Sequence, residues 1–320
     1  SYAVLCKNGT YSTDGTGACL DVGSGKQGQT FGSGSVQVSQ GASYAVQCID
    51  GTYNTDGIGS CQDIPPGHQG INLNGQYSGG TGAVNHTACL PGKYNTDGDG
   101  PCQDIPLGHQ GIQSNGQYNN GTGAVNHTAC LPGEYNTDGI GPCQDIPPGY
   151  QGQLVYNDGD STPYSGAIYA VQCFPGKFGS GTGPCQNIAK GYQGTKDGKY
   201  TRYGATEQHI CTDGTYNNDG SGACTDVGSG NQGQAIDTGS EQVSQGASYA
   251  VPCKDGTYNT DGIGSCQDIP PGHQGIQVNG QYSGSTGAVM HTCLFYTPDA
   301  PDHLTRSYYV SCLSIALSHL

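Results

Sequence analysis

The sequence predicts an all-β and irregular fold: a linear tandem array of small disulfide-stapled β modules of about 41 residues, with no large single core. Eight leading cysteines, at positions 6, 48, 89, 130, 173, 211, 253 and 293, recur at intervals of 38 to 43 residues. Only 33% of the 320 residues are hydrophobic, whereas a globular domain of this length has nearly half. Sixteen cysteines supply the disulfides that units of this size need to fold.

Each module is built around a cysteine-bracketed stretch, such as Cys130-Leu-Pro-Gly-Glu-Tyr-Asn-Thr-Asp-Gly-Ile-Gly-Pro-Cys143. A short alternating run before the first cysteine, such as Tyr-Ala-Val-Gln, predicts a strand. Asn-Thr-Asp-Gly predicts a tight turn, because glycine accepts positive φ and aspartate bonds its own backbone. Glycine every few residues disfavours helices throughout.

The repeat spacing places module boundaries along the whole chain. We expect modules at 1–36 (partial), 37–78, 79–119, 120–160, 161–201, 202–241 and 242–283, with a divergent eighth module or tail at 284–320. Cys6 to Cys211 and Cys48 to Cys253 both span 205 residues, which indicates duplication of a five-module block. Ser1 to Cys6 matches the interior of a repeat, so we expect a processed or partial piece of a longer secreted precursor.

The cysteines are expected to form disulfides, because their number is even and no close C-x2-C pair suggests zinc. Disulfides imply an oxidising, extracellular compartment. We favour pairing within each bracket: Cys6–Cys19, Cys48–Cys61, Cys89–Cys102, Cys130–Cys143, Cys173–Cys185, Cys211–Cys224 and Cys253–Cys266, with Cys293–Cys312 in the divergent end. The alternative staples adjacent modules, for example Cys19 to Cys48.

The stretch Cys89-Leu-Pro-Gly-Lys-Tyr-Asn-Thr-Asp-Gly-Asp-Gly-Pro-Cys102 resembles the ephrin-receptor-like (growth-factor-receptor-like) cysteine-rich repeat. The resemblance covers about 20 residues of each module. Where that family has a further cysteine before proline, this chain has Ile64, Ile105, Ile146 and Ile269, so an apolar contact is expected in place of one disulfide. The resemblance implies an extracellular spacer or adhesion element rather than an enzyme.

Pairs of aspartates recur in the repeats, and they suggest calcium as a bound ion, because hard cations prefer several oxygen atoms as ligands. The candidates are Asp97, Asp99 and Asp104. We favour turn and backbone hydrogen bonding for these residues, because Ile140 replaces Asp99 in another copy. No other metal site and no cofactor is expected.

Three further residue types recur at fixed places. The bracket tyrosines, such as Tyr53, are interpreted as packing residues, with sugar stacking as the alternative. His68, His109 and His273 are expected to be exposed, since Tyr or Lys replaces them in other copies. A glutamine follows in every copy, and we interpret it as an amide that bonds the backbone; these are Gln27, Gln69, Gln110, Gln151, Gln193, Gln232 and Gln274.

Four N-glycosylation sequons predict covalent glycans at Asn8, Asn85, Asn120 and Asn126. Serine-, threonine- and proline-rich stretches are candidates for further O-linked sugar. No catalytic residues are expected. The tail cluster of Asp299, Asp302, His303 and Arg306 lacks a nucleophile motif and is interpreted as a connecting segment.

A net charge of −15, dispersed over the modules, argues against a nucleic-acid partner. No apolar run reaches the length of a membrane span. We therefore expect a structural subunit of an extracellular glycoprotein filament or coat, such as a mastigoneme or a cell-wall fibre, that assembles with copies of itself. The alternative is an adhesin or receptor stalk that spaces a ligand-binding domain outside this segment; an enzyme is not expected.

Overall fold

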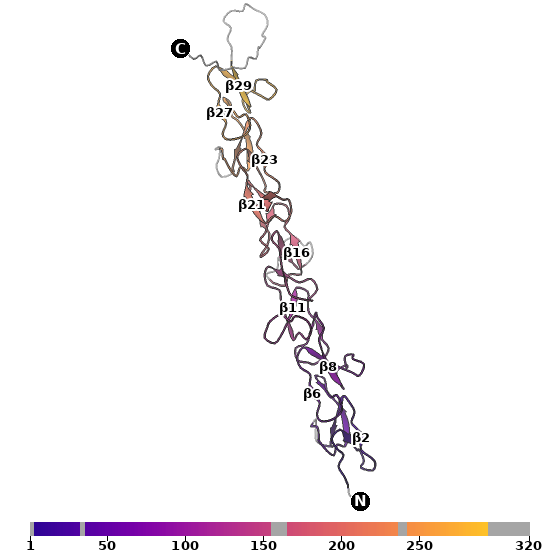
Figure 1. Ribbon diagram of the computed structural model, residues 1–320. Coiled ribbons are helices and arrows are strands. Elements are labelled where there is room, and N and C mark those ends of the chain that lie inside the picture. The colour runs from indigo at the N-terminus through magenta and orange to yellow at the C-terminus, as the bar shows by residue number, and fades with distance from the viewer. Residues whose placement is uncertain (1–2, 33–35, 155–164, 236–241, 294–320) are drawn as a thin grey trace, which may run out of the picture. The chain divides into compact units, whose positions relative to one another are not determined.

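The computed structural model describes residues 3–32, 36–154, 165–235 and 242–293 (Figure 1). All regular secondary structure in these ranges is β, in strands of two to five residues. The same ranges contain no helix that is long and apolar enough to cross a membrane. The predicted all-β fold is confirmed.

Two kinds of antiparallel hairpin alternate along the chain. In the bracket hairpins, a two-residue strand inside the cysteine bracket pairs with one just after it. These are β1 (Thr10–Tyr11) with β2 (Leu20–Asp21), β5 (Thr52–Tyr53) with β6 (Gln62–Asp63), β9 (Lys93–Tyr94) with β10 (Gln103–Asp104), β13 (Glu134–Tyr135) with β14 (Gln144–Asp145), β17 (Lys177–Phe178) with β18 (Gln186–Asn187), β22 (Thr215–Tyr216) with β23 (Thr225–Asp226), and β26 (Thr257–Tyr258) with β27 (Gln267–Asp268).

The connecting hairpins are longer and lead from one bracket to the next. They pair β3 (Lys26–Gln29) with β4 (Tyr44–Gln47), β7 (His68–Ile71) with β8 (Asn85–Ala88), β11 (His109–Ile112) with β12 (Asn126–Ala129), β15 (Tyr150–Gln153) with β16 (Tyr169–Gln172), β19 (Tyr192–Lys196) with β21 (Glu207–Ile210), β24 (Asn231–Gln234) with β25 (Tyr249–Pro252), and β28 (His273–Ile276) with β29 (Met290–Cys293). A short extra strand, β20 (Lys199–Tyr200), pairs with β19.

By their contacts the residues fall into two units. Unit 1 comprises Ser1–Ile146 and Gly152–Val171, and unit 2 comprises Pro147–Gln151 and Gln172–Leu320. Each unit contains the same alternation of bracket and connecting hairpins, so the repeat predicted from the cysteine spacing is present in both.

Seven disulfides staple the brackets. They join Cys6 to Cys19, Cys48 to Cys61, Cys89 to Cys102, Cys130 to Cys143, Cys173 to Cys185, Cys211 to Cys224, and Cys253 to Cys266. Pairing within brackets is confirmed, and the alternative that stapled adjacent modules is wrong. Closing a loop of this length stabilises a unit by about 3 kcal/mol in the chain-entropy treatment. Cys312, the predicted partner of Cys293, lies outside the described residues.

The apolar core is divided into small clusters, one in each repeat. Ile64 and Ala83 are 3% and 2% exposed, and Tyr53 forms a parallel bridge to Ala83. Gly70 on β7 lies between them, since a Cβ there would be 2.8 Å from the Ala83 Cβ and 3.0 Å from the Ile64 Cδ1. The apolar contact expected at Ile64 is therefore present.

Successive repeats, each counted from one leading cysteine to the next, approach so closely that some positions accept only glycine. A Cβ on Gly108 would lie 2.1 Å from the carbonyl oxygen of Gly166, well inside van der Waals contact. Gly108 also has a φ of +74°, which L side chains rarely adopt. The equivalent pairs are Gly25 with Gly82, Gly67 with Gly123, Gly149 with Gly204, Gly191 with Gly246, and Gly230 with Gly287.

We predict that Gly108→Ala destabilises unit 1 much more than Gly116→Ala. Both residues have positive φ, so both substitutions carry about 1–2 kcal/mol of backbone strain, but Gly116 has open space around it. The added steric clash at Gly108 should cost roughly a further 1–3 kcal/mol. Thermal unfolding and exchange of the Cys130 amide, which donates to the Gly108 oxygen, measure the effect. Equal effects of the two substitutions would contradict the close approach.

Candidate functional site

The most repeated feature of the structure is the contact that we call the junction. At a junction, the turn of one bracket hairpin packs against the repeat that precedes it. In the first junction of unit 1, the Gly25 amide donates to the Asn54 carbonyl oxygen over 2.6 Å. The Cys61 amide donates to the side-chain oxygen of Gln27 over 3.0 Å. A junction therefore consists mainly of polar contacts to the backbone.

A buried asparagine shapes the turn that enters five of the six described junctions, and Gly179 stands in its place in the sixth. Asn54 is 4% exposed; its Oδ1 accepts the Gly57 amide over 2.9 Å, and its Nδ2 donates to the Gly59 carbonyl oxygen over 3.3 Å. Asp56 completes the turn, since its Oδ1 accepts the Ile58 amide over 2.9 Å. Equivalent asparagines stand at Asn95, Asn136, Asn217 and Asn259. The Asn-Thr-Asp-Gly pattern predicted the turn, but it did not predict that the asparagine is buried and bonds the turn's backbone. The recurrence of this asparagine in several repeats was the signal that could have indicated its role.

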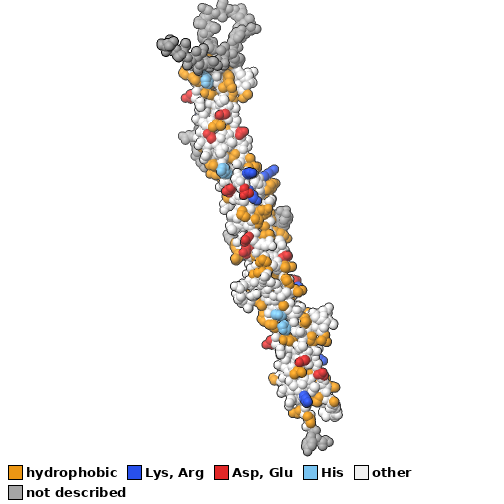
Figure 2. Space-filling model, viewed as in Figure 1, with side chains coloured by type: hydrophobic (Ala, Val, Ile, Leu, Met, Phe, Trp, Pro, Cys, Tyr) orange, Lys and Arg blue, Asp and Glu red, His pale blue; other side chains and the backbone are white. Residues whose placement is uncertain are grey.

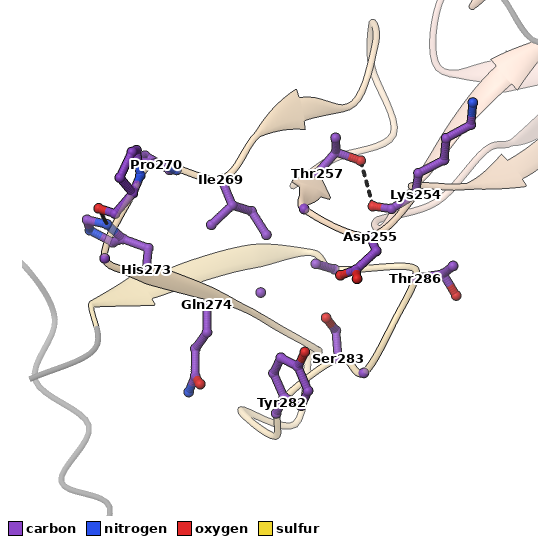
Figure 3. A pocket seen from close by; sticks show the side chains of 16 residues that line it. Lys254, Asp255, Thr257, Ile269, Pro270, His273, Gln274, Tyr282, Ser283 and Thr286 are labelled. Atoms are coloured by element: carbon purple, nitrogen blue, oxygen red, sulfur yellow. Dashed lines mark hydrogen bonds between the residues drawn. The ribbon is translucent and has the colours of Figure 1, made fainter.

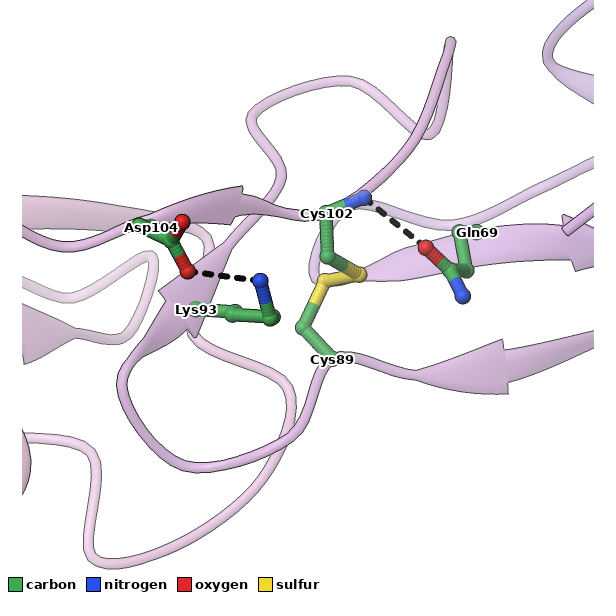
Figure 4. Close-up of polar contacts among 5 residues, drawn as sticks. All are labelled: Gln69, Cys89, Lys93, Cys102 and Asp104. Carbon is green, nitrogen blue, oxygen red and sulfur yellow. Dashed lines mark hydrogen bonds and ion pairs between the residues drawn. A yellow bond between two sulfur atoms is a disulfide. The ribbon is translucent and has the colours of Figure 1, made fainter.

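The recurring glutamine joins each turn to the preceding repeat. Gln69 Oε1 accepts the Cys102 amide over 2.9 Å, so the glutamine is bonded directly beside a disulfide (Figure 4). Five other copies make the same bond: Gln27 to Cys61, Gln110 to Cys143, Gln151 to Cys185, Gln193 to Cys224, and Gln232 to Cys266. The interpretation of these residues as backbone-bonding amides is confirmed for these six copies.

A side chain two residues after the first cysteine adds a further bond in some junctions. Asn8 Oδ1 accepts the Gly59 amide over 3.2 Å, and Asp50 Oδ1 accepts the Gly100 amide over 3.1 Å. In unit 2, Asp213 Oδ1 accepts the Gly264 amide over 3.1 Å. Other copies have proline at this position, so this bond supplements the junction.

The aspartates proposed for calcium have separate partners. Asp97 Oδ1 accepts the Asp99 amide over 3.0 Å within the turn. Asp104 forms an exposed ion pair with Lys93, with 2.6 Å between Oδ1 and Nζ (Figure 4). The Asp99 side chain lies against Gly51 of the preceding repeat. Among the described residues, no group of three or more His, Cys, Asp or Glu side chains is arranged to hold a metal.

The histidines differ from the expectation of exposure. His68 is half-buried, and its ring packs edge-on against His86 at 4.9 Å between centroids. His86 packs in turn against Tyr53 at 4.8 Å. The expectation of exposure was wrong because it was based only on the different residues that occupy the His68 position in other repeats. The partner histidine lies on the adjoining strand, 18 residues later in the sequence.

The same stack recurs in two other repeats. His109, His127 and Tyr94 form it in unit 1, and His273, His291 and Tyr258 form it in unit 2. The Tyr53 hydroxyl donates to Gln62 Oε1 over 3.0 Å, which agrees with the interpretation of the bracket tyrosines as packing residues.

The four sequons lie at the surface. Asn8, Asn85, Asn120 and Asn126 are all exposed, and Asn85 and Asn126 occupy equivalent places on β8 and β12. Figure 2 shows acidic side chains scattered along the visible face of each unit, as the dispersed charge predicted. The tail cluster of Asp299, Asp302, His303 and Arg306 lies outside the described residues.

The repeated junction is thus the most prominent feature of the described residues. The seven disulfides of the described brackets indicate an oxidising compartment. Neither a protein-family model nor a curated relative matches the sequence.

We predict that acid weakens the histidine stacks. Burial, and next the neighbouring imidazole, lower the pKa of His86, His127 and His291 below the ordinary value, and their Nδ1 atoms are buried without a hydrogen-bond partner. The unfolded chain therefore binds protons more readily. The stability contributed by the stacks is complete above about pH 6.5 and falls as the pH decreases below that value.

Melting temperatures at about pH 7.5 and about pH 5 measure this effect. The double variant His86→Ala/His127→Ala is the control, because Ala45 already occupies the matching register position in another repeat. The decrease in melting temperature should be smaller in the double variant. An equal decrease in both proteins would show that other groups cause the acid sensitivity.

Proposed function

We propose that this protein is a structural subunit of an extracellular glycoprotein filament or coat, of the kind found in mastigonemes or cell-wall fibres. The observation that supports this proposal best is the repetition of one junction along the chain. Near-identical units present the same surfaces many times, which suits self-assembly.

The use of the recurring polar side chains also supports a structural role. Asn54, Asp56 and Gln27 all bond to backbone amides, and so do their equivalents in most of the other described repeats. Chemistry requires polar groups that are directed toward a substrate. We therefore propose a non-enzymatic protein.

The extracellular setting rests on two observations. Disulfides at the density of one per repeat persist in secreted and cell-surface proteins. The sequon asparagines at Asn85 and Asn126 are exposed on hairpin strands, where they are accessible to glycosylation. The resemblance of the bracket to ephrin-receptor-like cysteine-rich repeats belongs to the same proposal.

Negative-stain electron microscopy of the purified, oxidised chain tests this function. We expect polymers whose length grows with protein concentration. A control sample reduced with a thiol should lose them, because each repeat depends on its disulfide. Separate particles at every concentration would contradict the filament proposal and favour a stalk that spaces a binding domain.

A further inference from the structure

A hollow of about 150 Å³ lies within unit 1, at the junction between the third and fourth brackets. We call it the notch and define it by Pro91, Ile105, Tyr118, Asn120 and Gly141, which all line it. Ile105 is buried, whereas Pro91 and Asn120 are exposed, so the notch leads from the surface toward a small apolar cluster.

An aspartate occupies the equivalent space in the preceding junction. Asp50 stands at the place of Pro91, and its Oδ1 accepts the Gly100 amide over 3.1 Å. A Cβ on Gly80 would lie 3.7 Å from Asp50 Oδ2. These two glycines correspond to two that line the notch, so the notch is the space that a carboxylate fills one repeat earlier.

Two repeats of unit 2 also have aspartate at this place. Asp213 Oδ1 accepts the Gly264 amide over 3.1 Å. In the last described repeat, Figure 3 shows the Asp255 side chain pointing into a hollow that Tyr282 and Ser283 also line. An oxygen acceptor at this place is therefore a recurring feature of the repeats, and Pro91 does not supply one.

The notch contains hydrogen-bond donors that its own repeat leaves open. Among the residues that the structure describes, the Gly141 amide has no acceptor, although Gly141 is half-buried and its equivalent Gly100 bonds to a carboxylate. A Cβ on Gly141 would lie 3.9 Å from the Tyr118 hydroxyl, which likewise bonds to none of the described residues. An unpaired amide removed from water costs free energy, so an oxygen atom that enters the notch is stabilised there.

A sequon stands at the edge of the notch. Asn120 begins the sequence Asn-Gly-Thr, and the loop that carries it is fixed, since Asn119 Nδ2 donates to the Thr122 carbonyl oxygen over 3.2 Å. The repeats that have Asp50 and Asp255 have glycine at the place of Asn120. The sequon and the loss of the carboxylate thus occur together in one repeat.

We infer that the first sugar of a glycan on Asn120 occupies the notch, where one of its oxygen atoms accepts the Gly141 amide. Attachment joins Asn120 Nδ2 to the anomeric carbon of a phosphate-linked glycosyl donor; the bond from that carbon to the phosphate oxygen breaks, and Nδ2 loses one proton. The sugar offers oxygen acceptors to the amide and its C–H groups to Pro91 and Ile140. This inference deepens the proposed glycoprotein function and rests on it, because it makes a glycan part of a junction.

Hydrogen exchange at the Gly141 amide tests the inference on the full chain secreted from a glycosylating host. Mass spectrometry should find a glycan on Asn120. Asn120→Gln removes this glycan, and the Gly141 amide should then exchange about tenfold faster because it loses its acceptor. Thr122→Ala removes the sequon but keeps the Asn120 side chain, and it should have the same effect.

A rescue variant tests whether the notch is the place where the acceptor acts. Pro91→Asp introduces the carboxylate that the preceding repeat has. In the Asn120→Gln background it should restore protection to the Gly141 amide, as Asp50 bonds the Gly100 amide. Fast exchange that persists in this double variant would contradict the inference.

Asn126→Gln is the matched control, because it removes a sequon on β12 that does not line the notch. It should leave exchange at Gly141 unchanged. The inference is overturned if Asn120 is bare while Asn85 or Asn126 carries a glycan, or if Asn120→Gln and the unaltered chain exchange equally. Either result leaves the glycoprotein function standing, whereas a lack of glycans on all four sequons defeats both.

Discussion

The structure depends on backbone-to-backbone contact between successive repeats. At each junction a turn lies so close to the preceding repeat that a Cβ on Gly98 would come within 2.1 Å of the Ile64 carbonyl oxygen. Glycine is required there because only it permits both the approach and the backbone conformation. This constraint accounts for the glycines that recur at the junctions, and it permits a low apolar content: repeats are joined by hydrogen bonds, and each encloses only a small cluster such as Ile64 and Ala83.

The disulfides and the junctions have complementary roles. A disulfide closes each bracket and reduces the entropy of the unfolded repeat, which has too little apolar area to fold alone. The junction then uses the amide of the second cysteine, as Cys102 shows with Gln69, so the stapled loop is also the loop that contacts the preceding repeat. A stable surface is thereby presented at every repeat. This arrangement suits a chain whose proposed role is to extend and to join.

The features that could be predicted from sequence are those encoded within one repeat. Cysteine spacing predicted the brackets, Asp-Gly predicted the turns, and a glutamine present in every copy predicted a structural amide. The junction itself was not predicted, because its partners are far apart in sequence: Gln69 and Cys102 are separated by 33 residues. The histidine stacks were missed for the same reason, since His86 meets His68 only when β7 and β8 pair.

Native-state hydrogen exchange tests most directly whether junctions couple the repeats. The amides of Gly67 and Cys102 cross a junction, while the Ile64 amide bonds to Gly51 within one repeat. If junctions couple the repeats, protection at Gly67 and Cys102 should match that at Ile64 within about tenfold, or about 1.4 kcal/mol. Rapid exchange at Gly67 and Cys102 with strong protection at Ile64 would show instead that the repeats are independent units joined by loose contacts.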